Sequence, residues 1–274
     1  MTIFQAIILG IFQGIAEFLP ISSSGHLVLL QSLFKIQEGN LFFAEMLHLG
    51  TLISIFIVYF NDIIIIIKEF FILTYDLFRY RKLRIDNEYK RLGLMIIVGS
   101  IPTGIIGILF SDFFEKLYSS VTIVGLALIV TGILLWAAEK LPPRNKKAND
   151  MKIYDALIIG LFQGFAITPG ISRSGSTIVG GLFRGFNKKL ATKFSFLLAL
   201  PATFGAGLLG IKDALSESSA IAIDLPLIVG VTISAITGVF AINILIKVLE
   251  KGKLHYFSYY VWIIGSIIIF KQFF

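Results

Sequence analysis

Residues 10–26 read Gly10-Ile-Phe-Gln-Gly-Ile-Ala-Glu-Phe-Leu-Pro-Ile-Ser-Ser-Ser-Gly-His26, and this stretch decides the fold because the chain contains it twice. The second copy reads Gly160-Leu-Phe-Gln-Gly-Phe-Ala-Ile-Thr-Pro-Gly-Ile-Ser-Arg-Ser-Gly-Ser176, and nine of the 17 aligned pairs are identical at a constant offset of 150 residues. The similarity continues where residues 43–49 align with 194–200. Self-similarity of this kind indicates repeated structural units. We therefore predict two related halves, residues 1–139 and 153–274, joined by a cytoplasmic linker at 140–152.

Each copy consists of an apolar stretch, a break rich in proline, glycine and serine, and a second short apolar stretch. Neither arm reaches comfortably the ~20 residues that a helix needs to cross a bilayer. Broken backbone at membrane depth is tolerated only where protein or a water-filled cavity covers it. We therefore expect a re-entrant hairpin at residues 1–34 and another at 153–186.

The composition is that of a membrane protein. The chain is 56% hydrophobic and 15% charged, with a mean hydropathy of +0.88, whereas soluble domains are about a quarter charged. Apolar stretches predict three spans in each half, near residues 41–60, 92–111, 119–139, 193–211, 225–249 and 256–273. Because three is odd, the second hairpin enters from the opposite face. The predicted fold is an all-α polytopic membrane protein with six transmembrane helices and two re-entrant helical hairpins in an inverted-topology repeat.

The basic residues agree with this topology. Four loops hold 18 of the 24 Lys and Arg residues, at 79–91, 140–152, 184–193 and 247–253. Cytoplasmic loops carry an excess of positive charge, and with both termini outside all four loops fall inside. Segment 62–91 must then lie on or dip into the cytoplasmic side. Because topology explains the net charge of +7, no nucleic-acid partner is expected, and the absence of cysteine excludes thiolate catalysis and Cys-ligated zinc.

The polar positions at which the two halves differ are the candidates for function. Ionisable groups in spanning segments cost roughly 2.5–3.5 kcal/mol each, so they tend to pair, line a cavity or serve a function. A buried salt bridge between Glu17 and Arg173 is one explanation, but it leaves His26 and the serines without a role. The differing pairs are Glu17 and Ile167, Ser23 and Arg173, His26 and Ser176, and Glu45 and Phe196.

The residues around the first break suit an anion. Gln13 and Glu17 are four apart and share a helix face, while the break offers hydroxyls and freed backbone amides. Arg173 has a planar guanidinium that suits phosphate oxygens. If the two hairpin tips meet, they supply what phosphoryl transfer to water or serine requires. We assign His26 as general acid or base, or as the group that activates Ser23.

Gln13-Gly-Ile-Ala-Glu17, the following Phe18-Leu-Pro-Ile-Ser-Ser-Ser-Gly-His26, and Pro169-Gly-Ile-Ser-Arg-Ser-Gly-Ser-Thr177 closely resemble the two signature motifs of the undecaprenyl-diphosphatase, or bacitracin-resistance, family. The resemblance covers the whole chain. It implies hydrolysis of undecaprenyl diphosphate to the monophosphate, which recycles the lipid carrier for peptidoglycan, supported by a divalent cation, Mg or Ca. It also implies a multi-pass protein of the bacterial plasma membrane whose site opens to the outer face.

The same resemblance implies roles for single residues. Glu17 becomes the essential acid, Ser23 the nucleophile or phosphate-binding hydroxyl, His26 the partner that activates or protonates, and Arg173 the diphosphate clamp. Glu17, with Glu45, becomes the metal ligand. The substrate-binding residues expected are Gln13, Ser22, Ser24, Gly25, Ser172, Ser174 and Thr177.

Two positions depart from the commonest family pattern. Gln13 stands where an acidic residue is more usual, and its amide binds a cation more weakly and cannot act as a base. Ser24 stands for a threonine, which is a mild change. Ser22 and Ser24 recur as Ser172 and Ser174, and serine also caps helices well.

A different functional class shares the predicted architecture, because secondary transporters are also built from inverted repeats with broken helices at the midplane. A carrier or flippase for a prenyl phosphate would move lipid between leaflets without releasing phosphate. Against it, the catalytic-type residues are divided unequally between the halves. The partners expected are therefore the lipid substrate and the membrane, with a homodimer as a candidate assembly.

Overall fold

The computed structural model describes residues 1–34, 41–118, 120–216 and 224–273. These residues form an all-helical structure, as predicted, and the only strand-like pairing among them is one bridge between Lys146 and Phe186. The elements are α1 (Ile3–Phe18), α2 (Ser23–Leu33), α3 (Leu41–Val58), α4 (Phe60–Tyr80), α5 (Glu88–Leu109), α6 (Ser111–Tyr118), α7 (Val121–Glu139), the 3-10 helix η1 (Ala148–Asp150), α8 (Ile153–Phe165), α9 (Arg173–Phe183), α10 (Lys188–Ser216), α11 (Leu225–Glu250) and α12 (His255–Phe273).

Each repeated motif forms two short helices separated by a break. The first pair is α1 and α2, where the chain turns through Pro20 and through Ser22, whose φ is +70°. The second pair is α8 and α9, where Gly170 has a φ of +94°. A side chain at Gly170 would also lie 2.5 Å from the carbonyl oxygen of Val124 in α7, so this turn requires glycine. Both breaks predicted from the sequence are present.

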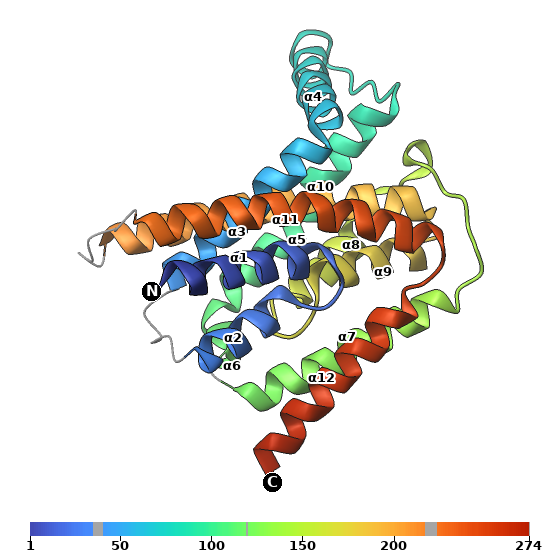
Figure 1. Ribbon diagram of the computed structural model, residues 1–274. Helices are drawn as coiled ribbons and strands as arrows, with labels where there is room; N and C mark the ends of the chain where they lie inside the picture. Colours follow the sequence, from blue (N-terminus) through green and yellow to red (C-terminus); the bar gives the residue numbers. More distant parts are fainter. Residues whose placement is uncertain (35–40, 119, 217–223, 274) are drawn as a thin grey trace.

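The hairpins pack against the bundle in two similar ways, with α1 along α11 and α8 along α5 (Figure 1). Close backbone approach makes both contacts. A Cβ atom on Gly10 would lie 2.6 Å from the carbonyl oxygen of Gly230, and one on Gly160 would collide with the carbonyl group of Gly99. Gly10 and Gly160 are equivalent positions of the repeat, so the same residue makes the same kind of contact in each half.

Four helices of the described chain, α5, α7, α10 and α11, are long and apolar enough to cross a membrane. They match the spans predicted near 92–111, 119–139, 193–211 and 225–249. The stretch predicted to span at 41–60 ends at Tyr59, where α3 and α4 form an angle of 85°, and it qualifies as a span only when the two are joined. The segment predicted at 256–273 forms α12, which lies along α7 but is not among the four described helices that are long and apolar enough to span.

Segment 62–91 forms α4 and a loop that leads into α5. Figure 1 shows α4 projecting away from the other helices. Large apolar side chains on it, such as Phe71 and Phe78, are exposed. Lys193 of α10 contacts Asp62 at 2.7 Å and so fixes the beginning of α4 to the bundle. In the loop, the hydrogen bond from Lys90 lowers the pKa of the exposed Asp86 carboxyl.

We predict that Gly10→Ala and Gly160→Ala each destabilise the protein by about 1–3 kcal/mol, because the added methyl group forces the packed backbones apart. SDS-induced unfolding in mixed micelles would measure the loss. Gly104→Ala is the matched control, since no atom lies within 4 Å of its added Cβ. Equal stability of all three variants would contradict the close contacts described above.

Candidate active site

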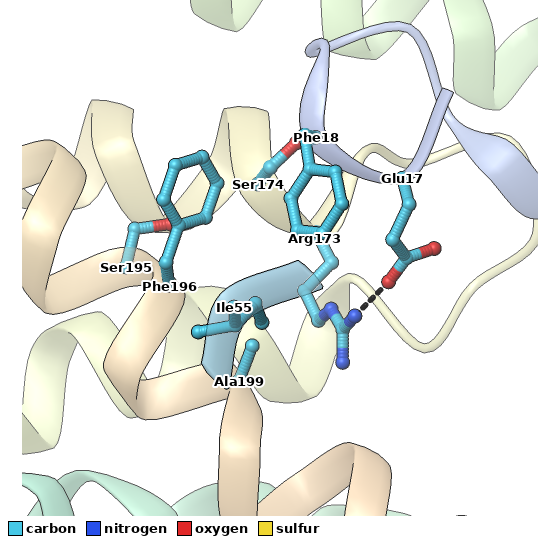
Figure 2. A pocket seen from close by; sticks show the side chains of 8 residues that line it. All are labelled: Glu17, Phe18, Ile55, Arg173, Ser174, Ser195, Phe196 and Ala199. Carbon is cyan, nitrogen blue, oxygen red and sulfur yellow. Dashed lines mark hydrogen bonds and ion pairs between the residues drawn. The ribbon is translucent and has the colours of Figure 1, made fainter. Parts of the chain in front are cut away.

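The tips of the two hairpins meet. Gly25 lies beside Gly170, with 3.4 Å between a Cβ built on Gly25 and the Gly170 Cα, and Gly175 lies beside Pro20 in the same way at 3.1 Å. Glu17 at the end of α1 forms an ion pair with Arg173 in the first turn of α9, joining Oε1 to Nη2 (Figure 2). This ion pair therefore joins two residues that are 156 positions apart in the sequence.

Arg173 is further oriented by α10, because its Nη1 donates a hydrogen bond to the Thr203 hydroxyl. The Glu17 side chain is only 4% exposed, and that of Arg173 is 24% exposed. A charge buried to this degree needs a partner, and each of these residues supplies it for the other. The guanidinium carries further N–H donors that could bind an anion.

Three polar side chains of the first half, Ser23, Gln13 and His48, contact the second carboxylate oxygen of Glu17. The Ser23 hydroxyl donates to Oε2 at 2.7 Å, and the Gln13 amide donates to it at 3.0 Å. His48 Nε2 lies 3.5 Å from the same oxygen. Glu17 is therefore the centre of the cluster, and the proton of Ser23 already points at a carboxylate.

His26 lies next to this cluster but makes different contacts. Its Nδ1 is 2.9 Å from the carbonyl oxygen of Ser22, and its Nε2 is 2.8 Å from the hydroxyl of Tyr260 in α12. We assigned His26 as a candidate to activate Ser23. In the structure both ring nitrogens are engaged elsewhere, and the group placed to accept the Ser23 proton is Glu17.

The serines shared by the two breaks have matching hydrogen bonds. Ser22 accepts from the backbone N–H of Gly25 at 3.3 Å, and Ser172 accepts from that of Gly175 at 3.1 Å. Each also lies 3.3 Å from the hydroxyl of the serine two residues on, Ser24 or Ser174. This identical pattern is helix capping, which explains why these serines recur in both halves.

A small pocket opens beside the ion pair, and Figure 2 shows the side chains around it. The Phe18 and Phe196 rings meet edge to face at 5.4 Å, and Tyr59 lies 6.2 Å from Phe196. Thr177 is buried behind the pocket, where it donates to the carbonyl oxygen of Arg173 at 2.9 Å and contacts Ser195. The lining residues are Glu17, Phe18, Ile55, Arg173, Ser174, Ser195, Phe196 and Ala199.

A second cavity, of about 150 Å³, lies between Tyr59 at the elbow of α3 and α4, the beginning of α10 and the end of α11. Its walls carry three lysines and one glutamate. It shares no lining residue with the first pocket, although α10 contributes to both. The lining residues are Tyr59, Lys188, Lys189, Thr192, Lys193, Ile246, Leu249 and Glu250.

The predicted metal ligands do not form a complete protein site. Within the described residues no three His, Asp or Glu side chains converge on a metal-sized position, so Glu17, Glu45 and His48 are not such a group. Glu45 lies against Gly210 of α10. The Gln13 Oε1 atom, next to Glu17, is buried and has no hydrogen-bond partner among the described residues. The Glu17 carboxylate and the Gln13 Oε1 atom are therefore enough for a Mg²⁺ ion that takes most of its ligands from phosphate oxygens and water.

Sequence reasoning missed two residues of the cluster. Thr203 and Tyr260 lie in apolar helices of the second half, and nothing in the repeat distinguishes them, because neither is one of the four polar mismatches. His48 of α3 also reaches Glu17, with its Nε2 3.5 Å from Oε2. Its position three residues after Glu45, on the helix that follows the first hairpin, is the signal that places it near the site.

Comparisons with known proteins agree with the geometry. The family model described as "Bacitracin resistance protein BacA" matches residues 6–267. The chain is 54% identical over 270 residues to "Undecaprenyl-diphosphatase" of Alkaliphilus metalliredigens, covering 98% of each chain. It is 48% identical to the protein of the same name from Halothermothrix orenii, with 98% of each covered, and 44% identical to that of Carboxydothermus hydrogenoformans, with 99% of this chain and 98% of the relative covered.

We predict that Glu17→Gln lowers the free energy of unfolding by about 3–5 kcal/mol, because it leaves the Arg173 charge buried without its partner. The double variant Glu17→Gln, Arg173→Gln should lose less than the sum of the single losses. SDS titration of the four proteins would measure the coupling. The same cycle on Asp62 and Lys193, whose carboxylate is 20% exposed, serves as the control, with an expected coupling of about 0–1 kcal/mol. Additive losses at Glu17 and Arg173 would contradict the ion pair.

Proposed function

The chain belongs to the bacitracin resistance protein BacA family, and from this premise we propose that it hydrolyses undecaprenyl diphosphate to undecaprenyl phosphate and inorganic phosphate. The reaction would recycle the lipid carrier for cell-wall synthesis and give resistance to bacitracin. One observation carries the proposal beyond the names of the relatives. A serine hydroxyl is hydrogen-bonded to a carboxylate that is itself paired with an arginine, at the meeting point of two broken helices.

Substrate binding would begin at Arg173. The diphosphate is an anion that can form bidentate hydrogen bonds with a guanidinium, and the pocket beside Arg173 is partly apolar, so such bonds are stronger there than in water. As Arg173 turns to the diphosphate, Oε1 of Glu17 becomes available. The beginning of α9, where Arg173 lies, adds the favourable dipole of a helix N-terminus.

The chemical step would transfer the terminal phosphoryl group. The oxygen of Ser23, or of a water in its place, attacks the terminal phosphorus, the bond to the bridging oxygen breaks, and undecaprenyl phosphate leaves. Glu17 takes the proton of the attacking hydroxyl, as its 2.7 Å contact with Ser23 suggests. If Ser23 attacks, a water then hydrolyses the phosphoserine. His26 is the group we propose to exchange a proton with the leaving phosphate or the attacking water.

We propose that a divalent cation, Mg²⁺ or Ca²⁺, supports the reaction by neutralising charge on the diphosphate. Glu17 and the Gln13 amide oxygen would hold it together with oxygens of the substrate, a mode usual for Mg²⁺. Glu45 remains the second carboxylate proposed for this cation.

The finer topology is likewise our proposal. We propose six spans and two re-entrant hairpins in an inverted repeat, with residues 140–152 in the cytoplasm and the site open to the outer side of the plasma membrane. The Gly10 and Gly160 contacts support the repeat, because equivalent glycines pack against α11 and α5. A homodimer is the assembly to test, by crosslinking in membranes. The transporter alternative gains no support, since the relatives carry the name of a phosphatase.

We expect detergent-purified protein to release phosphate from undecaprenyl diphosphate, and Glu17→Ala, His26→Ala and Arg173→Ala each to lower the rate at least about 100-fold. EDTA should abolish the activity, and added Mg²⁺ or Ca²⁺ should restore it. Thr232→Ala is the control, because this exposed hydroxyl on α11 bonds only within its own helix.

Full activity in all three site variants would refute the assigned site, whereas no phosphate release by the unmodified protein would refute the function itself. Mass spectrometry of a rapidly quenched reaction would then separate the two mechanisms. A phosphate on Ser23 indicates the covalent route, and its absence during steady turnover indicates direct attack by water.

The topology predicts the accessibility of introduced cysteines, and the chain has none of its own. In spheroplasts, a membrane-impermeant maleimide should label Asp112→Cys at once and Lys147→Cys only after permeabilisation. Both positions are exposed in the structure, so their labelling reports the side of the membrane. Labelling in the opposite order would reverse the proposed orientation.

A further inference from the structure

The contacts of His26 determine which of its nitrogens carries the proton. Nδ1 lies 2.9 Å from the carbonyl oxygen of Ser22, and a carbonyl oxygen can only accept a hydrogen bond. Nδ1 must therefore be protonated. In the neutral imidazole Nε2 is then the acceptor, so the Tyr260 hydroxyl, 2.8 Å away, donates to it.

The position of Tyr260 makes this hydrogen bond more than a local contact. His26 is buried, with 5% of its surface exposed, whereas Tyr260 is 38% exposed. The two rings stack with 5.6 Å between their centroids and an interplanar angle of 11°, which holds the hydroxyl at Nε2. Tyr260 therefore connects a buried imidazole with the surface of the described structure.

We infer that Tyr260 is a positioning residue that fixes the tautomer and the ring orientation of His26 by donating a hydrogen bond to Nε2. The inference rests on the proposed function in that it assigns the partner of a group used there.

Other ionisable groups reach His26 only indirectly. Glu17 of α1 and Arg173 of α9 lie on the far side of Ser23, three residues before His26. Tyr118 of α6 contacts Ser24. From α7, the buried side chains near the first hairpin, Val124 and Leu128, are apolar. Among the described residues, only Tyr260 brings an ionisable group to a ring nitrogen of His26.

The test compares Tyr260→Phe with Tyr259→Phe on the same helix. Tyr259 is 49% exposed, and its ring contacts His255 and Trp262, contacts that phenylalanine retains. We expect Tyr260→Phe to lower kcat roughly tenfold with little change in KM, because one hydrogen bond to the proton-exchanging group is lost. The limb of the pH–rate profile that is assigned to His26, because it is absent in His26→Ala, should move by roughly half to one pH unit in Tyr260→Phe. Tyr259→Phe should match the wild type in both.

A second readout does not depend on activity. Nitrogen NMR of 15N-histidine-labelled protein should show His26 as the Nδ1–H tautomer, and Tyr260→Phe should alter the Nε2 signal while Tyr259→Phe leaves it unchanged. An unaltered pH profile together with an unaltered Nε2 signal in Tyr260→Phe would overturn the inference. If the wild-type protein releases no phosphate, the proposed function fails, and the NMR result alone still decides whether Tyr260 sets the tautomer.

Should Tyr260→Phe unfold, 3-fluorotyrosine at position 260 replaces it, because it keeps the ring and the hydroxyl but makes the phenol more acidic. A shift of the Nε2 signal with the fluorinated residue would support the hydrogen bond. An unchanged signal would refute it.

Discussion

The structure depends on one buried charge pair. Glu17 and Arg173 lie at the ends of two broken helices, and neither charge could remain in this apolar interior alone. Their attraction therefore holds together two segments that are 156 residues apart in the sequence, at the place where Gly25 lies beside Gly170. The remaining polar contacts, from Ser23 and Gln13 to Glu17 and from Arg173 to Thr203, follow from the position of this pair.

The same pair connects stability with the proposed chemistry. An anion that takes Arg173 away from Glu17 replaces one charge-assisted contact with another and leaves a carboxylate beside the hydroxyl that it is to deprotonate. The Glu17–Arg173 ion pair thus holds the site closed until the substrate anion replaces Glu17 as the partner of Arg173. A buried salt bridge and a catalytic centre, which the sequence presented as competing explanations of Glu17, are compatible as two states of one arrangement.

The hairpins, four apolar helices and the pairing of Glu17 with Arg173 could be predicted from the sequence, because the repeat isolates the few polar mismatches and an internal charge needs a partner. The bend at Tyr59, the course of α12 and the partners of His26 could not. Tyr260 is 234 residues from His26, and its direction depends on how α12 packs against α7. The expected activation of Ser23 by His26 relied on spacing along the chain, whereas side-chain direction brings Ser23 to Glu17.

The aromatic side chains of Phe18, Phe196 and Tyr59 have a consequence for the cell as a whole. Phe18 and Phe196 line the cavity at the ion pair, Tyr59 lines the cavity that carries the lysines, and the rings of Tyr59 and Phe196 lie 6.2 Å apart between the two. A continuous polar path there would let protons and small ions leak down the electrochemical gradient. Because packed aromatic rings interrupt such a path, the protein can keep charged groups deep in its interior without dissipating the membrane potential.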